Sequence, residues 1–209
     1  MRPLLLAAML ACLTGGCAAV TKIAYNPTDG ARIRSVVVLP FDDSSVSDQA
    51  ADYGVAGYTS ETGAGRVVSK LFAQALEEEN ACQVLRGTAL SMACLEHKLE
   101  YSKLAAMDPA EVGRGLGVDG VVRGKVKAFR QTWGIALAKA EVAFQVECID
   151  AATGKVAWYA EADGYLVKGV ESDLALEASR RIARRVAERK PAAEAPAPAE
   201  TAPAAAPAE

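Results

Sequence analysis

Few side chains in this 209-residue sequence could do catalytic chemistry. Asp42, Asp43 and Asp48 follow the first expected strand, 33–39, where α/β sheets often bind ligands, so a metal or acid–base role is conceivable. The same aspartates are also typical of a solvated turn. His97 is the single histidine, too few for a zinc site built on imidazoles, and no serine or thiol has a convincing basic partner. We therefore expect no enzyme activity, no metal and no cofactor.

Two glycine-rich stretches could in principle hold a phosphate. Residues 115–120 match the GxGxxG pattern, but a dinucleotide site needs these glycines after a strand and before a helix. Here they follow an expected helix and open a strand, which favours a glycine helix end. Residues 57–66 do precede an expected helix, yet they lack the Gly-Lys-Ser/Thr ending of a P-loop, so a flexible loop is favoured.

Cys17 is the residue whose chemistry the sequence defines best. It follows one charge at Arg2, an apolar run over 4–13 and the small residues Thr14-Gly15-Gly16. This order is typical of a bacterial secretory signal, and its end, 14–17, is similar to a lipobox. In such a signal the cysteine thiol takes a diacylglyceryl group before a peptidase removes the preceding residues. The run is too short to span a bilayer, which needs about twenty residues, so an uncleaved anchor is the weaker alternative. Cys12 is a weaker second site because its apolar segment is very short.

Lipidation of Cys17 predicts both anchorage and compartment. Residues 1–16 are expected to be removed as a signal peptide, and acyl chains such as palmitate then hold the chain to a membrane without a transmembrane helix. The residue after the cysteine is Ala18 and not an aspartate. By resemblance to the sorting rule of enteric-type bacteria, this residue favours transfer to the periplasmic face of the outer membrane. Sorting to the inner membrane stays open, because that rule is not universal.

Charge and cysteine content narrow the class of protein further. The formal net charge is −3, so nothing indicates a basic protein that binds nucleic acid. Cys82, Cys94 and Cys148 remain after the signal, and an odd number allows at most one internal disulfide. Cys82 and Cys94 are the nearest pair in sequence, but small buried thiols are the favoured interpretation.

The chain divides into a tether, one folded domain and a tail. Residues 17–31 are expected to form a lipidated tether, which the turn residues of 26–30 interrupt. Residues 32–190 are numerous enough for one domain with a proper core. Residues 191–209 are almost entirely Ala, Pro and Glu and cannot bury enough apolar surface to offset their ordering entropy. We therefore expect a disordered tail.

The periodicity within 32–190 predicts an α/β order. Apolar runs and two-residue alternation indicate strands, and apolar residues at helical spacing indicate helices. The expected strands are 33–39, 83–86, 119–129, 139–150 and 155–166, and the expected helices are 64–79, 88–103, 108–117 and 172–189. This order predicts a single α/β (α+β) domain with a mixed sheet. Its amino-terminal half is a βαβ unit, its carboxy-terminal half an antiparallel meander, and helices pack on the sheet.

Two surface features could contact partners. The last expected helix carries five arginines and a lysine over 180–190, which could meet anionic lipid or cell wall. Cations near a helix C-terminus are stabilising by themselves, by about 0.3–1 kcal/mol each, so a structural role is favoured. Tyr53, Tyr58 and Trp133 lie in expected loops, and aromatic residues are enriched at interfaces. They are candidates for partner contact, the alternative being that they cap the ends of the sheet.

Four passages in this order, after the lipobox, resemble one group of bacterial envelope lipoproteins. They are RSVVVLPFDD at 34–43, GRVVSKLFAQALEE at 65–78, LGVDGVVRGKV at 116–126 and VECIDAATGKVAWYAEADG at 146–164. The group includes the curli-secretion channel lipoprotein and the lipoprotein activators of bifunctional penicillin-binding proteins. Its fold is similar to the amino-terminal domain of the Tol-system propeller protein. The resemblance implies a non-catalytic module that binds other proteins or assembles into rings.

The lengths of the connections argue against a pore. Channel-forming members of the group insert long amphipathic hairpins, and each membrane-spanning strand needs about 9–11 residues. The expected connections here are 130–138 and the turn 151–154, and neither has room for such a hairpin. The activator members work through a long tether that crosses the periplasm, which the short tether at 17–31 does not match.

The sequence thus predicts an outer-membrane-anchored periplasmic lipoprotein that acts as a non-catalytic protein-binding or assembly adaptor. The first alternative is a subunit of an export or secretion complex that forms rings without a barrel of its own. A weaker alternative is a periplasmic binder of a small ligand or glycan. The expected partners are the membrane, through the acyl chains on Cys17, and an unidentified envelope protein. The oligomeric state stays open.

Overall fold

The computed structural model describes the backbone of residues 18–27, 33–46, 58–60, 63–133, 138–167 and 169–188, and the side chains of 33–46, 63–131, 139–167 and 169–188. Cys17, Tyr53 and the expected tail over 191–209 lie outside the described residues. What the sequence indicates about them therefore stays a prediction.

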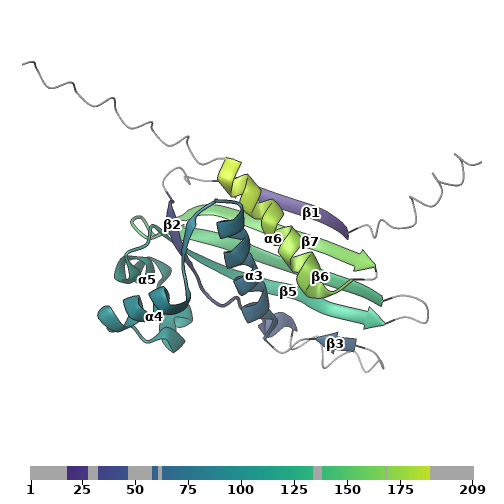
Figure 1. Cartoon of the computed structure of the whole chain (residues 1–209), viewed down its shortest axis with the longest axis horizontal. Coiled ribbons are helices and arrows are strands. Elements are labelled where there is room, and N and C mark those ends of the chain that lie inside the picture. Colours follow the sequence, from purple (N-terminus) through teal and green to yellow (C-terminus); the bar gives the residue numbers. More distant parts are fainter. Residues whose placement is uncertain are drawn as a thin grey trace, which may run out of the picture.

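A seven-stranded sheet forms the centre of the fold, in the order β1-β7-β6-β5-β2-β4, with β3 paired to β5 (Figure 1). The strands are β1 (Ala18–Pro27), β2 (Ser35–Val38), β3 (Tyr58–Ser60), β4 (Gln83–Leu85), β5 (Gly120–Trp133), β6 (Ala138–Asp150) and β7 (Val156–Val167). The helices are α3 (Ala64–Glu78), α4 (Gly87–Glu96), the 3₁₀ helix η2 (Tyr101–Ala106), α5 (Pro109–Leu116) and α6 (Glu171–Glu188).

The two halves of the sheet pair differently. Strand β2 pairs in parallel with both β4 and β5, and α3 lies in the crossover between β2 and β4. Strands β5, β6, β7 and β1 then pair antiparallel, each with the next. This arrangement confirms the expected fold class, a mixed sheet with a βαβ amino-terminal half, an antiparallel carboxy-terminal half and helices packed against it.

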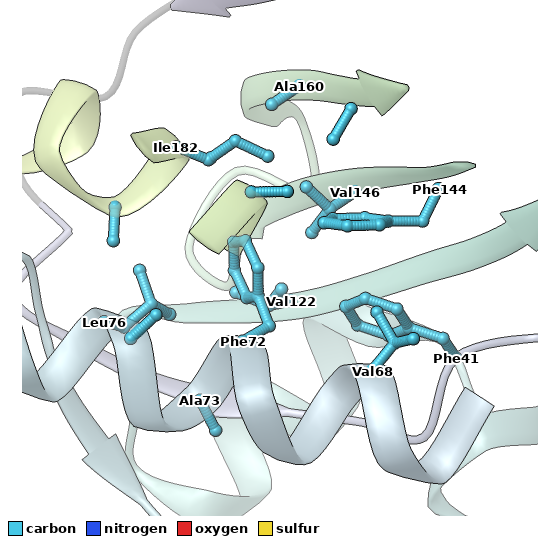
Figure 2. Packing of buried hydrophobic residues seen from close by; sticks show 14 of the residues in the cluster. Phe41, Val68, Phe72, Ala73, Leu76, Val122, Phe144, Val146, Ala160 and Ile182 are labelled. Carbon is cyan, nitrogen blue, oxygen red and sulfur yellow. The ribbon is translucent and has the colours of Figure 1, made fainter. Parts of the chain in front are cut away.

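Helices α3 and α6 lie over one face of the sheet and enclose the main core (Figures 1 and 2). Phe72 of α3 is completely buried, and its ring centroid lies 6.0 Å from that of Phe41, 6.4 Å from that of Phe144 and 6.2 Å from that of Trp158. Burying one such side chain stabilises a fold by about 1.5–3 kcal/mol relative to leaving it exposed. This aromatic cluster therefore binds α3 to β6 and β7.

A second, smaller cluster lies on the opposite face, under α4, η2 and α5. Val37 and Val121 point to this side because side chains alternate along a strand, and their neighbours Val36 and Val122 belong to the main core. The smaller cluster also contains Leu39, Leu90, Cys94, Leu104, Val112, Leu116 and Val118. Among the described residues, helices thus cover both faces of the sheet where α4 and α5 lie.

Asp119 joins the start of β5 to the start of β2. Its Oδ2 accepts the N–H groups of Arg34 and Ser35, each at 2.9 Å, and the Ser35 hydroxyl at 3.0 Å. Ser35 Oγ accepts the N–H of Asp119 at 3.0 Å in return. Burial raises the pKa of this carboxyl, but the hydrogen bonds lower it by more, so the pKa lies below its ordinary value. The aspartate of the passage 116–126 therefore holds two parallel strands in register.

Residues 18–27 are the largest departure from the expected organisation. The sequence predicts a tether here, but Ala18–Pro27 form β1, which pairs with β7 from Ala18 opposite Leu166 to Pro27 opposite Trp158. A β-bulge between Val20 and Lys22 shifts the register and breaks the two-residue alternation by which a half-buried strand is recognised. Within the described residues, pairing into the sheet therefore starts at Ala18, ahead of the expected domain start at residue 32.

Two other boundaries differ for local reasons. Strand β5 continues beyond Phe129 to Trp133, because a bulge between Val126 and Ala128 interrupts the alternation without ending the pairing with β6. The expected connection over 130–138 therefore shortens to 134–137. The expected helix 88–103 divides into α4 and η2, because Lys98 takes a left-handed conformation with φ of 54°.

Candidate interaction surfaces

Two of the predicted contact residues lie side by side at one end of the sheet. Trp133, the last residue of β5, pairs with Ala138 across the β5–β6 connection, and Tyr58 of β3 pairs with Thr132 next to it. The expectation that Tyr58 and Trp133 lie in loops is therefore wrong, because β5 is longer than its pattern suggests and also pairs with β3. Their side chains are outside the described part of the chain, and so is the whole of Tyr53.

Strand β1 begins at this same end of the sheet. Ala18 pairs with Leu166, and Ala19 pairs with Tyr165, near the end of β7. Because Ala18 follows Cys17 directly, the predicted lipidation site borders the sheet. We call this part of the molecule the Ala18 end, defined by Ala18, Ala19, Thr132, Trp133, Lys139, Tyr165, Leu166 and Val167.

A polar face covers β5, β6 and β7 on the side away from α3 and α6. Its ion pairs are Arg123 with Glu147 at 2.6 Å, Arg130 with Glu141 at 2.8 Å, Lys127 with Glu161 at 3.2 Å and Lys125 with Asp42 at 3.7 Å. A shallow hollow of about 260 Å³ lies here, lined by Asp42, Arg123, Gly124, Lys125, Gln145, Val146, Glu147 and Tyr159. Exposed ion pairs contribute only about 0–1 kcal/mol each. This face is thus a solvated surface whose charges are paired with one another.

Glu161 is the most strongly perturbed carboxylate on the polar face. Tyr159 donates a hydrogen bond to Glu161 Oε1 at 2.5 Å, and Gln145 and Lys127 donate to the same oxygen. These hydrogen bonds, that from Tyr159 first, lower the pKa of Glu161 to about 2. Burial, together with the hydrogen bond to Glu161, raises the pKa of Tyr159 to about 12. Glu161 is therefore ionised and Tyr159 protonated across the physiological pH range.

The low pKa of Glu161 makes a pH dependence of stability testable. A carboxylate whose pKa falls on folding stabilises the fold above its unfolded pKa and loses that contribution as the pH drops through its folded value. The stability difference between wild type and Glu161→Gln should therefore be largest above pH 4.5 and vanish as the pH approaches 2. Urea unfolding at a series of pH values measures it. A difference that does not change with pH would show that Glu161 gains nothing from ionisation.

The aspartates proposed for chemistry have local structural partners. Asp42 Oδ1 accepts the N–H of Ser44 at 3.0 Å, and this hydrogen bond first among several causes lowers its pKa. Asp43 Oδ2 accepts the N–H of Gly65 at 3.0 Å, at the start of α3. Asp48 lies outside the described residues, and within those residues no group of three or more His, Cys, Asp or Glu side chains could hold a metal ion. The turn interpretation therefore accounts for Asp42, whereas Asp43 holds the start of α3.

The helix boundary signals around α5 are confirmed. Asp108 accepts the N–H of Glu111 at 3.1 Å as an N-terminal cap, and Pro109 is the first helical residue. The helix ends at Leu116, and Gly117 follows it in the left-handed conformation with φ of 67°. The GxGxxG stretch at 115–120 therefore ends a helix and cannot present a helix N-terminus to a phosphate.

Cys82, Cys94 and Cys148 are buried and form no disulfide with one another, as the favoured interpretation predicts. Cys82 and Cys148 belong to the main core, whereas Cys94 belongs to the smaller cluster on the other face of the sheet. The pair nearest in sequence, Cys82 and Cys94, is thus separated by the sheet. Burial raises the pKa of the Cys148 thiol well above its ordinary value, so this thiol is unreactive in the folded protein.

The arginines of α6 bind the helix to α3. Arg180 pairs with Glu78 at 2.8 Å and Arg184 pairs with Glu79 at 2.9 Å. Arg181 pairs within the helix with Glu177 at 2.9 Å. Three of the arginines in the basic stripe are therefore used in ion pairs, a structural role different from the helix-end stabilisation that the sequence suggests.

Large exposed apolar side chains in the described residues gather in two places. Met92 and Leu95 on α4 are 61% and 75% exposed, and Tyr101 on η2 is 58% exposed. Tyr165 and Val170 are 40% and 45% exposed, at the other end of the sheet from α4 (Figure 1). Periodicity predicts none of these five exposed side chains, because it finds the buried face of an element and does not show which apolar side chains stay in contact with solvent. The part of the chain that the structure describes contains no helix long and apolar enough to cross a membrane.

Comparison with known proteins shows a shared fold. No protein-family model and no curated protein sequence matches the chain. A dodecamer of a leucine-to-methionine variant of PelC from Paraburkholderia phytofirmans is similar with a TM-score of 0.55 at 17% identity, over 79% of this chain and 96% of that one. A second PelC dodecamer from the same organism gives a TM-score of 0.53 at 18% identity, over 79% and 97%. Lipoprotein GNA1162 from Neisseria meningitidis gives 0.49 at 16% identity, over 74% and 99%.

The two PelC similarities support the sequence-based resemblance at the level of fold. The PelC chains match nearly from end to end, so this chain has the same arrangement of sheet and helices. At 17% and 18% identity the similarity concerns the fold alone. The particular lipoprotein group named by the resemblance stays a prediction.

Proposed function

We propose that the protein is a lipoprotein on the periplasmic face of the outer membrane and acts there as a non-catalytic assembly adaptor. The observation that carries the proposal is the position of β1, which begins at Ala18 and is therefore contiguous with the lipobox cysteine. A domain that starts there is placed at the membrane by the acyl chains alone, without a spanning helix.

The surface of the domain supports a binding role over a catalytic one. The charges of the polar face are paired with each other, and Asp42 and Asp43 are bonded within their own turn or to α3. By contrast, α4 exposes Met92 and Leu95, and large exposed apolar side chains grouped together are typical of contact surfaces. These features suit a module that meets other macromolecules.

A second candidate is self-assembly into a ring-like oligomer within an export complex. The fold that this chain shares with PelC assembles into dodecamers in that protein. Rings of identical subunits use heterologous contacts, in which two different surfaces of neighbouring copies meet. The α4 surface is apolar and the polar face is charged. A contact between α4 of one copy and the polar face of the next copy would therefore be heterologous.

In-cell photo-crosslinking separates the two candidates. A photoreactive amino acid is placed at Leu95 on α4, at Lys125 on the polar face, or at Arg185 on α6, each in the full lipidated chain. The adaptor role predicts adducts with a different envelope protein from at least one position. The oligomer predicts adducts whose masses are multiples of the chain itself. Adducts from none of the three positions would contradict both candidates.

A further inference from the structure

We propose that the Ala18 end of the sheet rests directly on the lipid headgroup layer, with Tyr165 and Val170 in contact with lipid. This inference rests on the proposed lipidation of Cys17 and goes beyond it. The acyl chains would hold the protein near the membrane in any orientation, whereas the position of β1 selects one end of the domain.

In the sequence, no residue separates the anchoring Cys17 from strand β1, which begins at Ala18. Ala19 pairs with Tyr165, and paired Cα atoms lie about 5 Å apart. Cys17 is two residues before Ala19, so its Cα lies within about 12 Å of the Tyr165 Cα. A tether over 17–31 would instead have allowed a separation of about 50 Å. The strand therefore holds the sheet within reach of the membrane surface.

The distance between the Cα atoms of Cys17 and Tyr165 decides whether the Ala18 end can reach the headgroup layer of the membrane. The polar headgroup region on each side of a bilayer is roughly 5–8 Å thick. Acyl chains on Cys17 place this residue at that layer, and the Tyr165 Cα lies within about 12 Å of the Cys17 Cα. The Ala18 end is therefore close enough for its exposed side chains to contact the headgroup region.

The side chains at the Ala18 end have a chemistry that suits a membrane–water interface. Tyr165 is 40% exposed, and Lys139 Nζ lies 4.9 Å from the centre of its ring. An amphipathic ring beside a lysine is the combination that is enriched at membrane–water interfaces. Val170 is 45% exposed, and the carbonyl of its neighbour Gly169 accepts a hydrogen bond from Gln131 of β5, which holds this segment against the sheet.

The charged side chains at the Ala18 end indicate which lipid headgroups it contacts. Lys139 contributes one positive charge, Arg130 and Glu141 neutralise each other at 2.8 Å, and α6 places Glu171 and Asp173 in its first turn. The local balance is not basic, so attraction to anionic lipid cannot supply the contact. We therefore expect a zwitterionic surface, rich in phosphatidylethanolamine, to be sufficient and the contact to depend little on salt.

Environment-sensitive labels on the lipidated protein test the orientation. Val170→Cys, Tyr165→Cys and, as the matched control at the other end of the sheet, Leu95→Cys are labelled with NBD. The native Cys82, Cys94 and Cys148 are buried. The lipidated variants are reconstituted into phosphatidylethanolamine vesicles with a minor fraction of phosphatidylglycerol, with and without doxyl-labelled lipid. We expect blue-shifted emission and quenching by doxyl lipid at positions 165 and 170, and water-like, unquenched emission at position 95.

The outcomes distinguish this inference from the proposed function. Flotation with the vesicles reports the lipid anchor, and the NBD emission reports the orientation. Flotation with water-like emission at 165 and 170 would overturn the orientation and leave the anchor intact. Equal quenching at position 95 would also overturn it, because the domain would then lie in no preferred orientation. Failure to float would overturn the anchor, and the orientation with it.

Discussion

Replacing Cys17 by alanine is expected to abolish lipid anchoring at the outer membrane in an all-or-none manner. The thiol is the proposed acceptor of the lipid, and stable attachment needs more than one acyl chain, so the loss of all of them leaves no anchor. The described residues contain no helix that could take over this role. The variant should appear in the soluble periplasmic fraction, or stay unprocessed with residues 1–16 attached, as read by fractionation and immunoblotting.

Cys12→Ala is the matched control for the same experiment. Cys12 lies within the apolar part of the signal and is expected to be removed with it, so this variant should be processed and fractionate like wild type. A Cys17→Ala protein that is processed and still fractionates with the outer membrane would be incompatible with the lipid anchor.

Phe72→Ala is expected to have the largest effect on stability. The ring is completely buried and contacts three other aromatic rings, at centroid distances from 6.0 to 6.4 Å. Removing a phenylalanine from such a core costs about 3–5 kcal/mol, through lost burial and the cavity left behind. Since the whole fold is stable by only about 5–15 kcal/mol, this is a large fraction of the total. Urea unfolding of the non-lipidated chain measures the change.

Leu95→Ala provides the comparison for Phe72→Ala. Leu95 is 75% exposed on α4, so its removal should change the free energy of unfolding by no more than about 0.5 kcal/mol. If Phe72→Ala and Leu95→Ala destabilised the chain equally, α3 would not pack against the sheet as described.

The fold class could be predicted from sequence because its signals are local. The apolar run before Pro40, the cap at Asp108 and the left-handed glycine at Gly117 each mark an element boundary by a short-range rule. The order of strands and helices then leaves few topologies. The parallel pairing of β2 with β4 is the βαβ unit that this order predicts, whereas the parallel pairing of β2 with β5 is seen only in the structure.

The features missed from sequence depend on contacts between distant residues. Strand β1 exists because Ala18–Pro27 pairs with β7, more than a hundred residues later, and its bulge hides the alternation. β3 similarly depends on the far part of β5. The candidate surface at the Ala18 end is formed by β1, β5, β6 and β7 together, so the sequence could indicate Trp133 and the neighbouring lipobox but not that they lie at the same end of one sheet.

The proposed function requires that Cys17 is the amino-terminal residue and carries the lipid anchor. Mass spectrometry of the amino-terminal peptide, prepared from the outer-membrane fraction, tests this most directly. The peptide is predicted to begin at Cys17 and to carry the added mass of its acyl chains. A peptide that begins at Met1, or that contains Cys17 without acylation, would contradict the claim.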